Sequence, residues 1–319
     1  MLSAFTLSNN RLRQIHLETA GEQRPENPIW IDVVAASSEE RHWVERIYKL
    51  KLPKPEHLRD IEASARFYEE EGEIHLRSDF LLGKLSESRS VTVAFVLSGD
   101  ILFSVHEEDL PVFHSLRTRT HLQSGDIESS KDVLIDLYSM DVEFSADALE
   151  EVYADLGDVS RAVLQTKLSD KAAAVVLASI AQAEHLNGRI RRNVMDTRRA
   201  MSFLMRSKML SPAQHEDARQ IMQDIDSLDG HTSFLFDKIN FLMSATVGFI
   251  NINQNKIVRL FSVASVALLP PMLIASIYGM NFRHMPELDW GMGYVFALGL
   301  MVLSVLLPFW LFQRKGWLK

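Results

Sequence analysis

The stretch Leu260–Phe282, LFSVASVALLPPMLIASIYGMNF, contains no charged residue and decides how the chain must fold. A second uncharged run, Trp290–Gln313, follows after a short loop. Both runs exceed the roughly 20 apolar residues that a helix needs to cross about 30 Å of hydrocarbon, and no earlier stretch does. The sequence therefore predicts two membrane-spanning helices at the C-terminal end. The alternative is two buried helices of a soluble protein.

Charged residues around the two runs predict their orientation. Lys256 and Arg259 precede the first run, whereas the loop after it carries Glu287 and Asp289. The basic residues that follow the second run are Arg314, Lys315 and Lys319. Because Lys and Arg concentrate on the cytoplasmic side of membrane proteins, both termini are expected in the cytoplasm and the loop outside. No signal peptide is expected, since the N-terminus lacks a basic region followed by an apolar core.

The composition excludes several classes of chemistry. The chain has 319 residues, a formal net charge of -8 and no cysteine, so thiolate metal sites and cysteine nucleophiles are absent. Its 11 histidines show no convincing metal-ligand spacing. We find no phosphate loop, nucleophile elbow, zinc-protease motif or strongly basic surface. The sequence thus predicts neither an enzyme nor a nucleic-acid-binding protein, and no organic cofactor.

Residues 1–131 are expected to form an α+β cytoplasmic domain. Helix starts are predicted at Ser37, where Glu40 completes a capping pattern, and at Lys54. The later strands are expected to pair as antiparallel hairpins across the turn-like Glu69–Gly72 and Ser98–Asp100. Short strands are predicted at Pro28–Val34, Ala65–Tyr68, Ile74–Leu82, Val91–Leu97 and Ile101–Val105.

Residues 132–256 are expected to form a helical stalk region, and residues 257–319 a two-helix membrane domain. Ser211 and Pro212 predict a helix restart, with the serine as N-cap. A continuous helix from Pro212 to Asn281 would be about 105 Å long. Gly230 and Gly248 are possible interruptions. Because such a stalk is hardly stable alone, the sequence predicts an oligomer.

One face of the first membrane helix combines polar ends with an apolar middle. Several copies of that face around an axis could line a pore, whose apolar middle would gate by dewetting. A helix-packing face would show the same periodicity, and both alternatives stay open. Pro270 and Pro271 remove two backbone donors within this helix, which is expected to set its angle. The residues on the face are Asn255, Val258, Phe261, Ser265, Leu269, Met272, Ser276 and Gly279.

The membrane helix ends in Tyr278-Gly279-Met280-Asn281, and Met285-Pro286-Glu287-Leu288 follows in the loop. Glycine and asparagine commonly end helices in a left-handed conformation, so each alone has an ordinary explanation. Together the two motifs resemble the markers of the CorA family of magnesium and cobalt channels, and the similarity extends over essentially the whole chain.

The resemblance implies a funnel-shaped homopentamer in the bacterial inner membrane, with the first membrane helix lining the pore. It implies a selectivity site at Gly279, Met280 and Asn281, where five asparagine amides hydrogen-bond the waters around Mg²⁺. Glu287 would attract cations to the mouth. The family also has a cytoplasmic regulatory Mg²⁺ site between subunits. The nearest matches to its carboxylates are Asp224 and Asp226, with Asp229 nearby and Glu87 as partner.

The sequence thus predicts a channel for inward flow of Mg²⁺ and Co²⁺, with Ni²⁺ as a further candidate cargo. The membrane potential would drive the flow and internal Mg²⁺ would gate it. Two alternatives remain: a zinc transporter of the same superfamily, and a membrane-anchored coiled-coil scaffold or sensor. The expected partners are further copies of the chain, the lipid bilayer and divalent cations.

Overall fold

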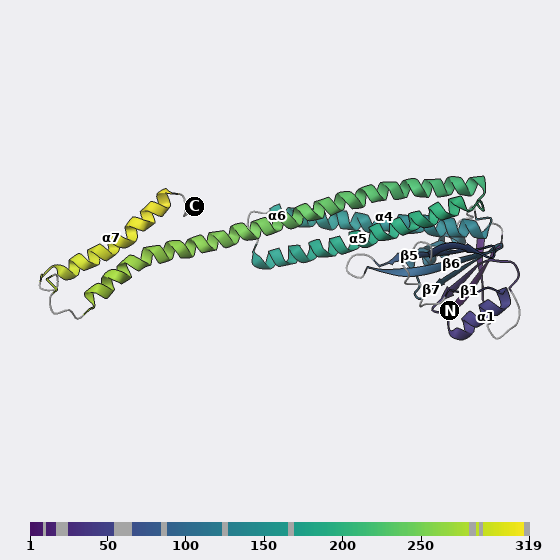
Figure 1. Cartoon of the computed structure of the whole chain (residues 1–319), viewed down its shortest axis with the longest axis horizontal. Helices are drawn as coiled ribbons and strands as arrows, with labels where there is room; N and C mark the ends of the chain where they lie inside the picture. The colour runs from purple at the N-terminus through teal and green to yellow at the C-terminus, as the bar shows by residue number, and fades with distance from the viewer. Residues whose placement is uncertain are drawn as a thin grey trace. The chain divides into compact units, whose positions relative to one another are not determined.

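A computed structural model describes residues 1–8, 11–16, 25–53, 66–83, 88–122, 127–164, 169–280, 285–286 and 290–315. The chain divides into two compact units (Figure 1). The first contains Met1–Thr166 and Ala174–Met243, and the second contains Lys167–Ala173 and Ser244–Lys319. One long helix contributes to both units. The predicted domain boundaries after residues 131 and 256 remain predictions, because these units are defined by contacts and not by function.

The first unit contains a seven-stranded sheet in the order β2-β1-β3-β7-β6-β5-β4. The predicted hairpins β4–β5 and β6–β7 are antiparallel, as expected, but β3 pairs with β7 in parallel. Neither β1, β2 nor the parallel pair is among the features that the sequence predicts. The strands are β1 (Leu2–Ser8), β2 (Arg11–His16), β3 (Pro28–Val34), β4 (Phe67–Glu70), β5 (Glu73–Leu82), β6 (Arg89–Ser98) and β7 (Ile101–His106).

Two tight turns set the register of these hairpins. Glu71 and Gly72 both have positive φ, at 52° and 82°, which suits the twist of a two-residue hairpin turn. Gly99 adopts φ 59° between β6 and β7. A residue with a side chain is strained at such a φ, so glycine occurs at these two positions of left-handed backbone.

Six helices are described, and α1 and α6 begin where the sequence predicts. Ser37 and Glu40 form the expected capping box. The Ser211 hydroxyl accepts from the Gln214 N–H at 3.2 Å, and the Gln214 side chain accepts from the Ser211 N–H at 2.9 Å. The predicted start at Lys54 lies outside the described residues. The helices are α1 (Ser38–Tyr48), α3 (Pro111–Leu122), α4 (Ser130–Leu164), α5 (Asp170–Arg206), α6 (Pro212–Tyr278) and α7 (Gly293–Arg314).

Helix α6 is continuous over its 67 residues, so neither Gly230 nor Gly248 interrupts it. Pro270 and Pro271 also lie inside the helix. At 1.5 Å per residue its length is about 100 Å, which confirms the long helix expected from the sequence.

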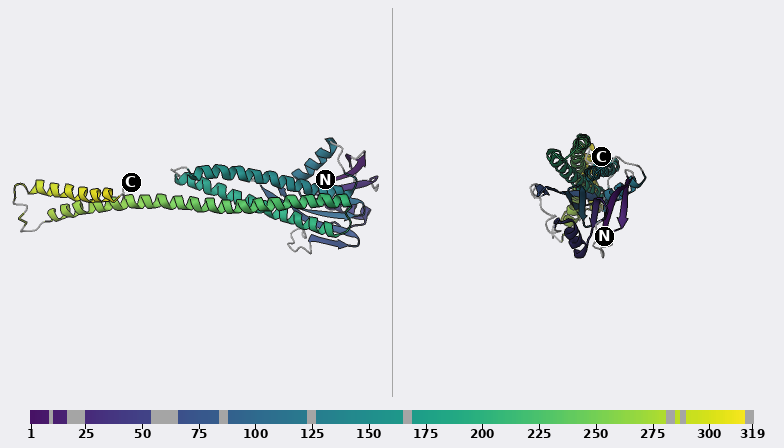
Figure 2. Two further views of the ribbon diagram at one scale, coloured as in Figure 1. Left: turned by 90° about the horizontal axis from the view of Figure 1, so that it is seen from above. Right: turned by 90° about the vertical axis from the view of Figure 1, so that its right-hand side faces the viewer.

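Helices lie beside the sheet of the first unit (Figure 2). Aromatic rings join the helices to the sheet. Phe80 of β5 and Phe95 of β6 both contact Tyr138 of α4, with ring centroids 5.9 and 5.6 Å apart. Phe113 of α3 stacks on Phe95 at 6.3 Å. All four side chains are buried, so this cluster fixes α3 and α4 on the sheet.

A buried carboxylate also ties α4 to α5. Asp141 accepts hydrogen bonds from Asn193 at 2.9 Å and from Thr197 at 2.9 Å. Burial raises the pKa of Asp141 to about 7, although the Asn193 and Thr197 hydrogen bonds work in the opposite direction. Because a lost partner would leave a buried acceptor unsatisfied, these bonds specify how the two helices pair.

A second buried polar cluster crosses the parallel pair of strands. Asp32 of β3 accepts from the Ser104 hydroxyl at 2.6 Å and from Arg117 at 3.0 Å. His106 Nε2 lies 2.9 Å from the same carboxylate. Burial alone lowers the pKa of His106, but the hydrogen bond and the charge of Asp32 outweigh it, so the pKa is raised.

This raised pKa of His106 predicts that the stability of the first unit depends on pH. The folded state binds the His106 proton more tightly than the unfolded chain does. The stabilisation is therefore complete below the unfolded pKa of about 6.5 and is lost as pH rises through the folded pKa. Protection of β3 and β7 from hydrogen exchange, corrected for intrinsic rates, should fall as pH rises in the native chain. His106→Gln should flatten this profile, and parallel profiles for the two chains would contradict the assignment.

Candidate ion-conducting helix

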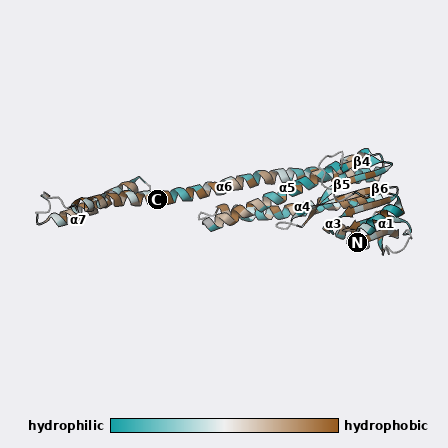
Figure 3. Ribbon diagram, turned by 60° about the horizontal axis from the view of Figure 1, so that its bottom comes forward, coloured by the Kyte–Doolittle hydropathy of each residue, from teal (hydrophilic) through white to brown (hydrophobic). Residues whose placement is uncertain are grey.

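Two described helices are long and apolar enough to cross a membrane, α6 and α7. Figure 3 shows the hydrophobic residues gathered along α7 and the C-terminal part of α6. In their most apolar windows only 11% and 6% of residues are buried, respectively. A core helix of a soluble protein would be mostly buried. The structure therefore favours membrane spans over the soluble alternative.

Within the second unit, small residues bring α6 and α7 together. Val263 and Ala267 of α6 are 4% and 6% exposed, and Ala297 of α7 is 6% exposed. Gly293 at the start of α7 is also buried. Because lipid tails are as apolar as leucine, membrane helices associate where small side chains allow close packing. One side of α6 is thus covered by α7, which runs beside it in Figures 1 and 2.

The predicted pore face lies on the other side of α6. With 100° per residue, its mean direction is about 170° from the buried side marked by Val263 and Ala267. The four large apolar residues of this face are 61–72% exposed: Val258, Phe261, Leu269 and Met272. Asn255, Ser265 and Ser276 are exposed as well. None of the residues that the structure describes covers this face, so the helix-packing alternative does not apply to α7.

The end of α6 shows why glycine occupies position 279. Gly279 is not among the residues with positive φ, so it does not form the left-handed cap considered from the sequence. Its N–H donates to the Ala275 carbonyl at 2.9 Å. An added Cβ would lie 3.2 Å from that same carbonyl oxygen, closer than nearly all real contacts of this kind. Met280 is 48% exposed, and both Asn281 and Glu287 lie outside the described residues.

The candidate regulatory carboxylates differ in their surroundings. Asp226 pairs with Arg198 of α5 at 2.9 Å, and Asp229 pairs with Arg191 at 3.4 Å. Asp224 is exposed and accepts only a weak hydrogen bond from Gln220, at 3.3 Å. Of the three aspartates, Asp224 therefore has the least compensated charge.

No cluster of three or more potential metal ligands occurs within the described parts of the chain. Any metal site that uses Asp224 would need ligands from elsewhere, and Glu87 lies outside the described residues. Sequence reasoning missed Arg198 as the partner of Asp226, because the two residues come from different helices. The packing residues Ala267 and Ala297 were also missed, although small residues within apolar runs are a recognisable signal.

Comparison with known proteins gives a consistent assignment. The sequence model of one family, described as "CorA-like Mg2+ transporter protein", matches residues 25–314. The magnesium transport protein CorA of Escherichia coli is 42% identical over 320 residues, covering 100% of both chains. Its counterpart in Yersinia pseudotuberculosis is 40% identical over 319 residues, again with 100% coverage of both.

The fold is also found among solved structures. The complete structure of the CorA magnesium transporter from Methanocaldococcus jannaschii matches with a TM-score of 0.78 and 17% sequence identity. The match covers 99% of this chain and 98% of the other. It confirms the predicted order of a mixed α+β domain, long helices and two C-terminal apolar helices.

The small buried residues of α6 and α7 lead to a prediction about the thermal stability of the chain. Ala267→Leu would overpack this buried position, which typically costs about 1–3 kcal/mol. The melting temperature of the purified chain in detergent should fall, whereas Ala267→Ser should change it little because the side chain stays small. Equal melting temperatures for Ala267→Leu and the native chain would contradict the close packing.

Proposed function

Because the chain belongs to the CorA-like Mg²⁺ transporter family, we propose that it conducts Mg²⁺ into the cell across the bacterial inner membrane. The observation that carries this proposal is the exposed face of α6, a polar and apolar surface that no described residue of the same chain covers. Co²⁺ is proposed as a second cargo and Ni²⁺ as a further candidate. The family description is that of a transporter, so we assign the chain no reaction and no organic cofactor.

The pore is proposed to form between copies of the chain. One α6 cannot enclose a channel, but copies arranged around an axis can turn their exposed faces inward while α7 remains on the outer side. A homopentamer, as the family resemblance implies, would place five Leu269 and five Met272 side chains around one lumen. Such an apolar ring blocks hydrated ions by dewetting when it is narrow.

The proposed selectivity site lies at Gly279, Met280 and Asn281. Mg²⁺ releases its water ligands reluctantly, so a ring of neutral amides can recognise the hydrated ion without removing its shell. We propose that Glu287 raises the local cation concentration outside this ring.

The membrane potential is sufficient to drive the proposed flow. A charge of +2 gains about 4.6 kcal/mol for each 100 mV that it crosses toward a negative interior. Uptake then needs no nucleotide hydrolysis. Lys256 and Arg259 precede the first span, and Arg314 and Lys315 follow the second, which supports an orientation with both termini in the cytoplasm.

Regulation by internal Mg²⁺ is proposed to act through Asp224, with Asp226 and Glu87 as further candidates. A bound cation would bridge carboxylates of neighbouring copies, and its loss would leave like charges that repel. The contacts within one chain favour Asp224 as the principal ligand, since Arg198 already balances Asp226.

The alternatives from the sequence find less support. The family model and the full-length relatives are both described as transporters of magnesium, so a zinc transporter is not favoured. A membrane-anchored scaffold would explain the helices, but it would not require a hydrophilic and apolar lining on the free side of α6.

The proposed function is tested by uptake into liposomes. The purified chain is reconstituted around a magnesium-sensitive dye, and an inside-negative potential is imposed. Mg²⁺ should enter, and Asn281→Ala should reduce the rate by at least about tenfold, because every copy loses an amide that holds the hydrated ion. Asn253→Ala, on another side of the same helix, should retain the native rate.

No Mg²⁺ entry by the native chain would overturn the transport function. Equal rates for Asn281→Ala and the native chain would overturn only the role of Asn281. Entry of Zn²⁺ without Mg²⁺ would favour the zinc alternative.

The regulatory proposal has its own test in the same liposomes. Mg²⁺ enclosed at increasing concentration should slow uptake of a second cation, Co²⁺, by the native chain. Asp224→Asn should shift this inhibition to higher internal Mg²⁺, because neutral side chains bind the ion more weakly. Asp217→Asn, elsewhere on α6, serves as the control. Identical inhibition curves for Asp224→Asn and the native chain would exclude Asp224 as a regulatory ligand.

A further inference from the structure

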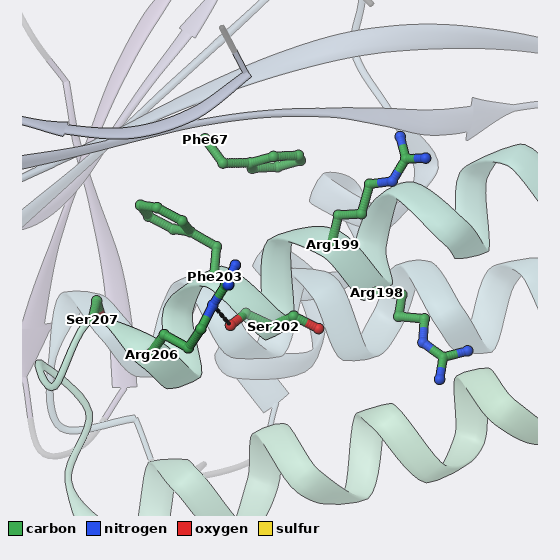
Figure 4. A pocket seen from close by; sticks show the side chains of 7 residues that line it. All are labelled: Phe67, Arg198, Arg199, Ser202, Phe203, Arg206 and Ser207. Carbon is green, nitrogen blue, oxygen red and sulfur yellow. Dashed lines mark hydrogen bonds between the residues drawn. The ribbon is translucent and has the colours of Figure 1, made fainter. Parts of the chain in front are cut away.

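The first unit contains a pocket that the proposed transport does not use. It lies between β4 and the C-terminal part of α5 and has a volume of about 710 Å³ (Figure 4). Sites for small molecules typically measure about 300–1,000 Å³. Its lining includes two aromatic rings, Phe67 and Phe203, and three arginines, Arg198, Arg199 and Arg206.

The spacing along α5 brings these groups to one side of the helix. Arg199, Phe203 and Arg206 stand at positions i, i+4 and i+7, and such residues share a helix face. The two arginine Cα atoms are therefore about 10 Å apart along the axis, with the phenylalanine between them. Phe67 faces Phe203 from the sheet (Figure 4).

A buried ion pair holds the aromatic side of the pocket in place. Arg66 Nη2 lies 2.7 Å from Asp196 Oδ2, and the same oxygen accepts from the Asp79 N–H at 2.9 Å. Arg66 and Asp196 are both buried. Because Phe67 follows Arg66 in the chain, this pair fixes its ring against Phe203, at a centroid distance of 6.4 Å and an angle of 35°.

The arginines are not equally available to a ligand. Arg198 turns toward α6 and pairs with Asp226 at 2.9 Å. Arg206 Nε donates to the Ser202 carbonyl at 3.1 Å, which anchors its side chain beside the pocket. Arg199 and Arg206 are exposed, and neither has a carboxylate ion pair within the described ranges. Two exposed positive charges therefore flank an aromatic pair, and the charge of Arg199 also acts on the buried Asp196 carboxylate.

We propose that this pocket binds a nucleoside triphosphate. The planar base would stack on the half-exposed ring of Phe203, which the buried Phe67 supports from the sheet, since aromatic side chains are the common platforms for nucleobases. The phosphate chain would lie between Arg199 and Arg206, because the guanidinium fork matches phosphate oxygens and cannot lose its charge. No acidic side chain lines the pocket among the described residues, which disfavours a cation as the occupant.

The experiment is calorimetric titration of the full chain in detergent, with a chelator present to remove free Mg²⁺. Adenosine triphosphate is the probe, and tripolyphosphate and adenosine separate its two parts. The native chain should bind adenosine triphosphate more tightly than either part. The double change Arg199→Gln and Arg206→Gln should weaken binding by at least about tenfold, through loss of two charge-assisted contacts. Arg192→Gln, an exposed arginine of α5 outside the pocket, should bind like the native chain.

Circular dichroism of each variant verifies that its helices are retained. Phe203→Leu tests the stacking of the base separately from the phosphate contacts. This variant should weaken binding of adenosine triphosphate by about tenfold and leave tripolyphosphate binding unchanged. Absence of heat with native chain at millimolar adenosine triphosphate would overturn the proposal. Unchanged affinity in the double arginine variant would also overturn it. Tripolyphosphate binding as tightly as adenosine triphosphate would reduce the site to a general anion site and overturn the nucleotide assignment.

Discussion

The membrane segment of helix α6 is apolar nearly all round, and the described residues cover only one side of it. Val263 and Ala267 are buried on the side of α7, while Phe261 and Met272 remain 72% and 63% exposed on the other side. An uncovered face with Ser265 and Ser276 among its members gains little from lipid, because hydroxyls there find few partners. The simplest way to satisfy this face is to assemble copies around a lumen. We propose on this basis that oligomerisation and conduction have the same cause.

The first unit has a different basis for its stability. Buried aromatic rings join the sheet to α3 and α4, and buried polar contacts then specify which partners are correct. Asp141 joins α4 to α5, Asp32 joins β3 to β7 and α3, and Arg66 joins β4 to α5. The carboxylates of these contacts, Asp141, Asp32 and Asp196, each accept from several donors at once, so an alternative packing would leave buried polar groups unsatisfied. Helix α6 begins within this unit and belongs to the second unit at its other end.

Much of this architecture could be predicted from the sequence, because its signals are local. The Ser37 and Ser211 caps, the hairpin turn at Gly72 and the two apolar runs all depend on residues close in the chain. The parallel pairing of β3 with β7 and the ion pair of Arg198 with Asp226 could not be predicted, since both join distant segments. For the candidate site, periodicity identified the exposed face of α6, but it could not show which side α7 covers. The roles of Asn281, Glu287 and Glu87 rest on the family resemblance alone.

The central claim, that the free side of α6 lines the path of the ion, is tested most directly by thiol modification. The chain has no cysteine, so single cysteines report one position each. In reconstituted liposomes, a positively charged, water-soluble thiol reagent is added to Ser265→Cys and to Ala267→Cys, and Mg²⁺ uptake is compared before and after. The account predicts that the reagent blocks uptake by Ser265→Cys and leaves Ala267→Cys unaffected. Block of Ala267→Cys together with full uptake by modified Ser265→Cys would contradict it.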